Sequence, residues 1–125
     1  MRGKFLFVLA AAAAPLGAQA AADTTSPELI ASGKKVFEGK AGGAICFSCH
    51  GMNARGMPGV GPDLTDGKWL HGDGGIAFLE KLIAAGVARP KQSVAAMPPM
   101  GGAKLDATQI RALAAYIASL NAKKD

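Results

Sequence analysis

The sequence predicts an all-α domain in which three main helices are joined by long loops. Three stretches carry apolar residues at helical spacing, bounded by residues that favour helix ends. Two other stretches, 51–72 and 86–102, are rich in glycine and proline and are predicted to lack regular structure. No segment alternates apolar and polar residues as a strand would, and the sequence has no internal repeat.

The first helix is predicted over Pro27–Glu38. Ser26 suits the N-cap position because its hydroxyl can accept a hydrogen bond from an unpaired amide of the first turn. Proline at the next position leaves no amide unpaired, and Gly39 is typical of the residue that ends a helix. The large apolar residues fall on one face, which predicts that this helix packs against a core.

Two further helices are predicted. One spans Gly75–Ala85, with Asp73 as its cap. The other spans Asp106–Asn121 and begins with a capping box, in which Asp106 and Gln109 each bond the other's backbone amide. This last segment has a strong apolar stripe with a period of 3.6 residues, formed by Ile110, Leu113, Ala114, Ile117 and Leu120.

Residues 1–22 have the features of a secretory signal peptide. Arg2 and Lys4 precede an apolar run over Phe5–Leu16, and small residues then form a cleavage site near Ala20 or Ala22. The polar residues that follow favour cleavage over the alternative, an uncleaved N-terminal anchor. We therefore expect one periplasmic domain over residues 23–125, with no stable membrane insertion after cleavage.

Charge and core size narrow the function classes. Without Arg2 and Lys4 the net charge falls from +5 to +3, and the other lysines are scattered, so no nucleic-acid partner is expected. Large apolar side chains are few for a domain of about 100 residues. Domains with small hydrophobic cores usually need another source of stability, such as a disulfide, a metal or a cofactor, and a covalently bound cofactor would supply it here.

Cys46, Cys49 and His50 form a C-x-x-C-H motif, the pattern of c-type haem attachment. On one turn of helix, thiols three residues apart can each form a thioether with a haem vinyl group, and His50 can then ligate the iron. The alternatives are a redox dithiol, half of a zinc site and a structural disulfide. They are disfavoured because the sequence lacks a βαβ pattern, a second Cys or His pair, and a long loop between the cysteines.

A second axial ligand has to come from elsewhere in the chain. The candidates are Met97, Met100, Met52, Met57 and His71. Met52 and Met57 follow His50 too closely to reach the opposite face of a haem easily. Met97 stands in a proline-stiffened loop outside any helical stripe, which favours a ligand over core filler, and the position of the prolines favours it over Met100.

These motifs resemble the class I cytochrome c family, of the bacterial periplasmic monohaem type, over nearly the whole segment after residue 22. The resemblance rests on Gly33 and Phe37, C-F-S-C-H, G-P-D-L at 61–64, M-P-P-M-G-G at 97–102, and Leu113 with Tyr116. It implies the cytochrome c fold, with three main helices and long loops wrapped around one covalently bound haem c. It further implies that Gly33 lies where the first and last helices cross, that the Pro62 carbonyl accepts a hydrogen bond from His50, and that Met97 is the distal ligand.

Three further side chains are candidates for the surroundings of the haem. Trp69 lies in a short segment, residues 68–72, that looks like cytochrome domains attached to oxidases and dehydrogenases. Its indole N–H would bind a haem propionate, with a partly buried core tryptophan as the alternative. His71 is expected at the surface or beside a propionate, and Arg55 either pairs with a propionate or is solvated.

With His50 and Met97 as metal ligands, no iron position is open to a substrate, so we expect an electron carrier and not an enzyme. The expected function is periplasmic one-electron transfer from a dehydrogenase or other respiratory donor to a terminal oxidase or reductase. The partners would be redox proteins, steered by lysines such as Lys40, Lys68 and Lys91, and the protein itself a monomer. The alternatives are a cytochrome subunit of a dehydrogenase or oxidase complex, and a haem-based ligand binder if Met97 is labile.

Overall fold

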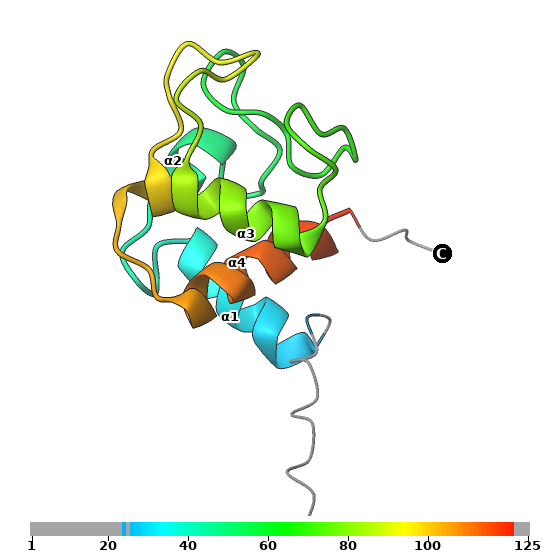
Figure 1. The fold of residues 1–125 in the computed structure, drawn as a ribbon, viewed down its shortest axis with the longest axis vertical. Helices are drawn as coiled ribbons and strands as arrows, with labels where there is room; N and C mark the ends of the chain where they lie inside the picture. The colour runs from blue at the N-terminus through cyan, green and yellow to red at the C-terminus, as the bar shows by residue number, and fades with distance from the viewer. Residues whose placement is uncertain (1–23, 25, 122–125) are drawn as a thin grey trace, which may run out of the picture.

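The computed structural model describes Thr24 and residues 26–121, and Figure 1 shows helices joined by irregular loops. The elements in chain order are α1 (Pro27–Phe37), α2 (Phe47–His50), α3 (Ile76–Ala85), the 3₁₀ helix η1 (Pro99–Gly102) and α4 (Ala107–Ser119). The all-α prediction is confirmed, because residues 26–121 contain two isolated β-bridges and no strand. The predicted signal peptide, residues 1–22, lies outside the described residues.

Local capping groups set the helix starts. The Ser26 hydroxyl accepts a hydrogen bond from the Leu29 amide at 3.2 Å, as predicted. The predicted capping box is also present, because the Gln109 amide donates to Asp106 at 2.8 Å and the Asp106 amide donates to Gln109 at 3.0 Å. These two side-chain caps satisfy amides that would otherwise lack partners where α1 and α4 begin.

The prediction that Asp73 caps α3 is wrong. Gly75 is the N-cap residue, and no side chain bonds the first turn of this helix. Two glycines separate the Asp73 carboxylate from Ile76, so it instead accepts a hydrogen bond from the Gly75 amide at 2.8 Å. This contact closes a turn two residues long and ends the loop just before the helix.

Helix α4 packs against α1 and α3, which places it between them in Figure 1. A Cβ at Gly33 of α1 would lie 1.9 Å from the Ala112 carbonyl oxygen of α4, so only glycine permits this approach. Beside the contact, the rings of Phe37 and Tyr116 pack with centroids 5.5 Å apart, tilted by 59°. The helix crossing implied by the family resemblance is therefore present.

Residues 51–72 and 87–97 form the loops at the end of the molecule beyond α2 and α3 (Figure 1). The prediction that 86–102 lacks regular structure is wrong for its last four residues, which form η1. The Val94 amide donates to the Gly59 carbonyl at 3.1 Å, which joins one loop to the other. Within the described residues, none of the helices combines the length and the apolar character that crossing a membrane requires.

Replacing Gly33 with alanine is expected to lower the free energy of unfolding by about 3 kcal/mol. The added methyl group would overlap the Ala112 carbonyl and force α1 away from α4. Urea denaturation measures the loss. Ser32→Ala is the control, since Ser32 is exposed on the same helix and its substitution should change stability by less than about 0.5 kcal/mol. Equal stabilities of the two variants would show that the helices do not meet this closely.

Candidate cofactor site

A large apolar cavity opens between the helices and the two loops. Its space amounts to about 1200 Å³ when the solvent-open mouth is included. Side chains of all four α-helices and of the loops line it. The apolar residues lining it include Leu64, Leu79, Leu82, Ile83, Leu113 and Ile117. The long loops therefore enclose a space that the chain's own side chains leave open, which is the arrangement a large flat cofactor requires.

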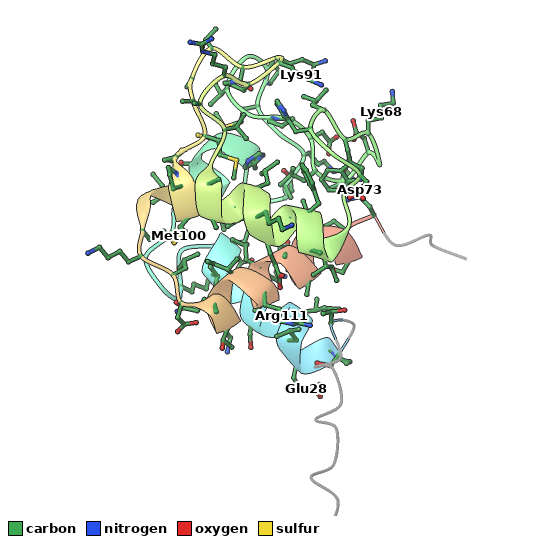
Figure 2. The ribbon with its side chains drawn as sticks, viewed as in Figure 1. Glu28, Lys68, Asp73, Lys91, Met100 and Arg111 are labelled. Atoms are coloured by element: carbon green, nitrogen blue, oxygen red, sulfur yellow. The ribbon has the colours of Figure 1, made fainter. Side chains whose placement is uncertain are left out.

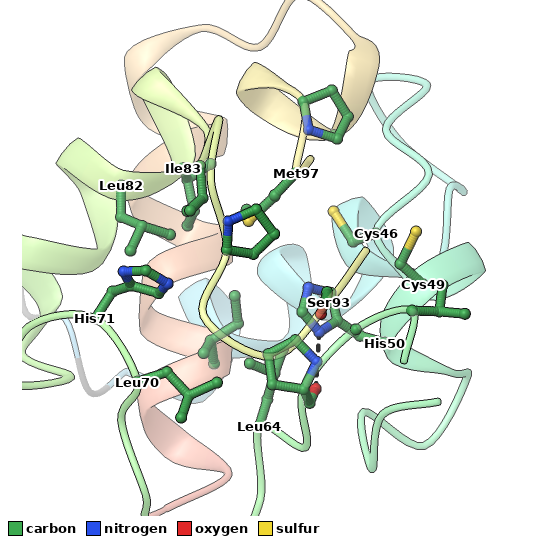
Figure 3. Close-up of a pocket in the computed structure, with 18 of the residues that line it drawn as sticks. Cys46, Cys49, His50, Leu64, Leu70, His71, Leu82, Ile83, Ser93 and Met97 are labelled. Atoms are coloured by element: carbon green, nitrogen blue, oxygen red, sulfur yellow. Dashed lines mark hydrogen bonds between the residues drawn. The ribbon is translucent and has the colours of Figure 1, made fainter. Parts of the chain in front are cut away.

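Both cysteines line this cavity from α2. The amides of Cys49 and His50 donate to the Cys46 carbonyl, at 3.3 and 3.0 Å, so the motif forms one helical turn. Residues three apart share a face of such a turn, and Figure 3 shows both sulfur atoms on the same side of the cavity. Burial raises the pKa of the Cys46 thiol, whereas a reactive dithiol needs a lowered one. The raised pKa of the Cys46 thiol therefore argues against the redox-dithiol alternative.

His50 is held by a hydrogen bond that leaves its other ring nitrogen available. The side chain is only 8% exposed, and its Nδ1 lies 3.0 Å from the Pro62 carbonyl oxygen. A carbonyl can only accept, so Nδ1 carries the proton and Nε2 keeps its lone pair. Burial lowers the pKa of His50, and the bond to Pro62 opposes part of that shift. The neutral imidazole is thus oriented as a metal ligand would be.

Two glycines allow the loop bearing Pro62 to reach His50. A Cβ at Gly61 would lie 2.6 Å from the Cys49 carbonyl oxygen, so this loop rests directly on the backbone of α2. At Gly56, where φ is +80°, a Cβ would lie 2.6 Å from the Asp63 amide. The predicted hydrogen bond between His50 and Pro62 therefore depends on backbone contacts that no larger residue would permit.

Of the five candidates for the distal ligand, two line the cavity. Met52 and Met57 are 56% and 41% exposed and lie outside it. Met100 lies in η1, where its backbone is left-handed with φ of +54°, and its side chain packs against the core. Met97 and His71 are the remaining two, and both point into the cavity in Figure 3.

The backbone of Met97 is fixed to the end of α3. Its amide donates to the Val87 carbonyl, and the Val87 amide donates to its carbonyl, both at 2.9 Å. A Cβ at Gly86 would lie 2.5 Å from the Met97 carbonyl oxygen and 2.7 Å from the Pro99 nitrogen. We call residues 86, 87 and 97 the strap. The sequence predicted only that a helix ends at Ala85, because pairing between residues ten apart in a loop has no local signal.

The other predicted residues are distributed between this cavity and its surroundings. Trp69 lines the cavity, and its indole rests on Gly74, where a Cβ would lie 2.0 Å from the ring nitrogen. Arg55 does not line the cavity but a second recess, with Asp63 and Gln92. His71, expected at the surface or beside a propionate, is part of the cavity wall. Among the described residues, no group of three or more His, Cys, Asp or Glu side chains could hold a metal ion.

Comparison with known proteins gives one consistent family. The family model described as cytochrome c oxidase, cbb3-type, subunit III matches residues 28–117. The chain is 39% identical over 97 residues to the cbb3-type oxidase subunit FixP of Bradyrhizobium sp. (strain ORS 278), covering 75% of this chain and 28% of FixP. It is 46% identical over 80 residues to the CcoP subunit of the cbb3-type oxidase of Rhodobacter capsulatus, a match that covers 60% of this chain and 25% of CcoP. The chain thus spans about a quarter of the length of these curated relatives.

Solved structures support the fold. The cytochrome cL of Methylophaga aminisulfidivorans matches with a TM-score of 0.58 at 23% identity, over 78% of this chain and 57% of that one. The predicted cytochrome c fold is therefore confirmed.

Replacing Gly86 with alanine is expected to release the strap. The added Cβ would overlap the Met97 carbonyl, and the backbone φ of +69° would strain any residue with a side chain. We expect the amides of Val87 and Met97 to exchange with solvent about tenfold faster or more, measured by hydrogen–deuterium exchange.

Gly43→Ala is the matched control for this experiment. Gly43 has a similar φ of +74°, but a Cβ there would meet nothing within 4 Å. Gly43→Ala should therefore lose the stability that a side chain at positive φ costs, while the position of Met97 stays unchanged. If both variants left exchange at Val87 and Met97 unchanged, the strap would not be held as described.

Proposed function

The chain belongs to the family of cbb3-type cytochrome c oxidase subunit III, and we propose that it carries single electrons to an oxidase of this type through one haem c. A cytochrome c domain implies haem c. The observation that carries the proposal is a cavity walled by Cys46, Cys49, His50 and Met97, with His50 already oriented by Pro62. The bound haem would supply a one-electron Fe(II)/Fe(III) couple.

Each of these residues has a defined role in the proposal. The Cys46 and Cys49 thiols would hold the haem as thioethers, each sulfur bonding one vinyl group whose other carbon takes up the thiol hydrogen. His50 Nε2 and the Met97 thioether would hold the iron, and the weak thioether donor would raise the reduction potential. Apolar walls around the site exclude water, which limits solvent reorganisation when the charge of the iron changes.

His50 and Met97 together favour electron transfer over catalysis or ligand binding. If both held the iron, a substrate or gas would have to displace one of them. The strap opposes displacement of Met97, since two backbone hydrogen bonds hold its position. We therefore propose a carrier that is not an enzyme, and we place the haem-based ligand binder second.

Electrons would enter and leave beside the cysteines. Ile45, the neighbour of Cys46, is 51% exposed and lines the mouth of the cavity, so this edge lies near solvent. Lys68 and Lys91 are exposed on the loops, and Figure 2 shows them extending outward. Lys40 instead pairs with Glu38 at 2.6 Å, which makes it a weaker steering group. An acidic partner surface would meet Lys68 and Lys91 first.

The named relatives are oxidase subunits, which supports the subunit role over a free periplasmic shuttle. We propose association with the oxidase on the periplasmic side, reached by the signal peptide predicted over residues 1–22. A stable oxidase complex would replace the predicted monomeric state. Cleavage of the leader without stable membrane insertion stays a prediction.

Met97→Leu is expected to remove the distal ligand from the holoprotein. The ferric form should lose the far-red charge-transfer band that marks thioether ligation, and the reduced form should bind carbon monoxide rapidly. Its reduction potential should fall. Met100→Leu is the matched control and should keep the band, because Met100 lies outside the cavity. The reverse pattern would assign the ligand to Met100.

Reduced holoprotein mixed with a purified cbb3-type oxidase should be oxidised at a rate that falls as ionic strength rises. Stopped-flow absorbance of the haem measures this rate. Lys91→Glu should slow it several-fold at low salt, whereas Lys35→Glu, exposed on α1, should have little effect. Co-purification with the oxidase in detergent would favour a subunit, and turnover without co-purification would favour a shuttle. Failure to reduce the oxidase would exclude both.

A further inference from the structure

His71 has a buried ring nitrogen with no partner inside the protein. Its Nε2 is buried and makes no hydrogen bond, although the side chain lines the cavity. Buried polar atoms in native proteins are almost always paired, so an orphaned one indicates a group that the protein does not itself supply. The other imidazole of the cavity, His50, is paired with the Pro62 carbonyl.

The position of His71 relative to the cysteines identifies which part of a haem it would meet. Figure 3 shows His71 across the cavity from Cys46 and Cys49. A porphyrin of the haem type carries its vinyl groups on two adjacent pyrroles and its propionates on the other two. If the vinyl edge is fixed at the cysteines, the propionate edge therefore faces the side where His71 lies.

The loop that carries His71 is packed firmly enough to position it. A Cβ at Gly72 would lie 2.2 Å from the ring of Phe78 on α3, so that ring covers the backbone immediately after His71. The Trp69 indole, two residues before His71, rests on Gly74, three residues after it. Lys68 and Trp69 also line the cavity, so this loop brings a cation and N–H donors to the same wall.

We infer that His71 donates a hydrogen bond from Nε2–H to a haem propionate, an inference that rests on the haem site proposed above. A carboxylate next to apolar walls requires donors, and the unpaired nitrogen supplies one. Ligation of iron by His71 is the less favoured role, because the strap fixes Met97 at the cavity. A donor on the propionate withdraws negative charge from the haem, so His71 would raise the reduction potential.

The test uses the holoprotein and two variants at one fixed pH. His71→Leu removes the donor, and His71→Gln keeps an N–H near the position of Nε2. Resonance Raman spectroscopy reports the propionate bending band, redox titration reports the potential, and the far-red band reports Met97. We expect His71→Leu to shift the propionate band and lower the potential while Met97 ligation stays intact. His71→Gln should keep the propionate band and the potential close to their wild-type values. If His71→Leu folds poorly, His71→Gln still tests whether an N–H at this position is enough.

Two results would overturn the inference. An unchanged propionate band and potential in His71→Leu would show that His71 touches no propionate. Loss of the far-red band in both His71→Leu and His71→Gln would show that His71 supports the ligation by Met97 and does not bind a propionate. Failure of the proposed function is distinguishable, because it would appear in the wild-type protein as the absence of covalent haem with His/Met ligation.

Discussion

Gly33 meets the carbonyl of Ala112 where α1 crosses α4, and the cavity depends on this approach. Phe37, Leu113 and Ile117, which flank the crossing, all reach the cavity wall. If the two helices stood one methyl group farther apart, these side chains would move with them. The contact therefore sets the depth of the site as well as the stability of the helix pair.

The loops reach their places by resting backbone on backbone. Gly61 lies on the Cys49 carbonyl of α2, and Gly86 lies against the Met97 carbonyl beyond α3. Such contacts do not need a filled apolar core, which suits a domain whose centre is a cavity. One contact places Pro62, which orients His50. The other places Met97, which is proposed to bind the iron on the face opposite His50.

The extent to which the sequence predicted this structure follows from how local each feature is. Ser26 and the Asp106–Gln109 box were predicted because a cap acts within three residues. Asp73 was assigned wrongly because two glycines moved the helix start beyond its reach. The bond from His50 to Pro62 was expected only through a family resemblance, since twelve residues separate the partners.

Long-range backbone pairing could not be predicted from the residues. Nothing in the local sequence indicates that Val87 pairs with Met97, and this pairing is what holds Met97 at the cavity. Met97 and Met100 differ by three positions, yet the turn at Pro98 and Pro99 sends one to the cavity and the other to the core. Proline stiffness indicated a fixed loop, but the direction of each side chain was set by tertiary contacts.

The two histidines show how hydrogen bonding separates the roles of identical side chains. His50 donates from Nδ1 to a carbonyl, so its free nitrogen has a lone pair and faces the cavity as an electron-pair donor. Nε2 of His71 has no such partner, and it is the nitrogen proposed to carry the proton and donate it to an anion. One imidazole is thus prepared for a metal cation and the other for a carboxylate. A haem presents both, iron at its centre and propionates at one edge, and this pairing of unlike demands in one apolar cavity is what favours a haem over a bare metal ion.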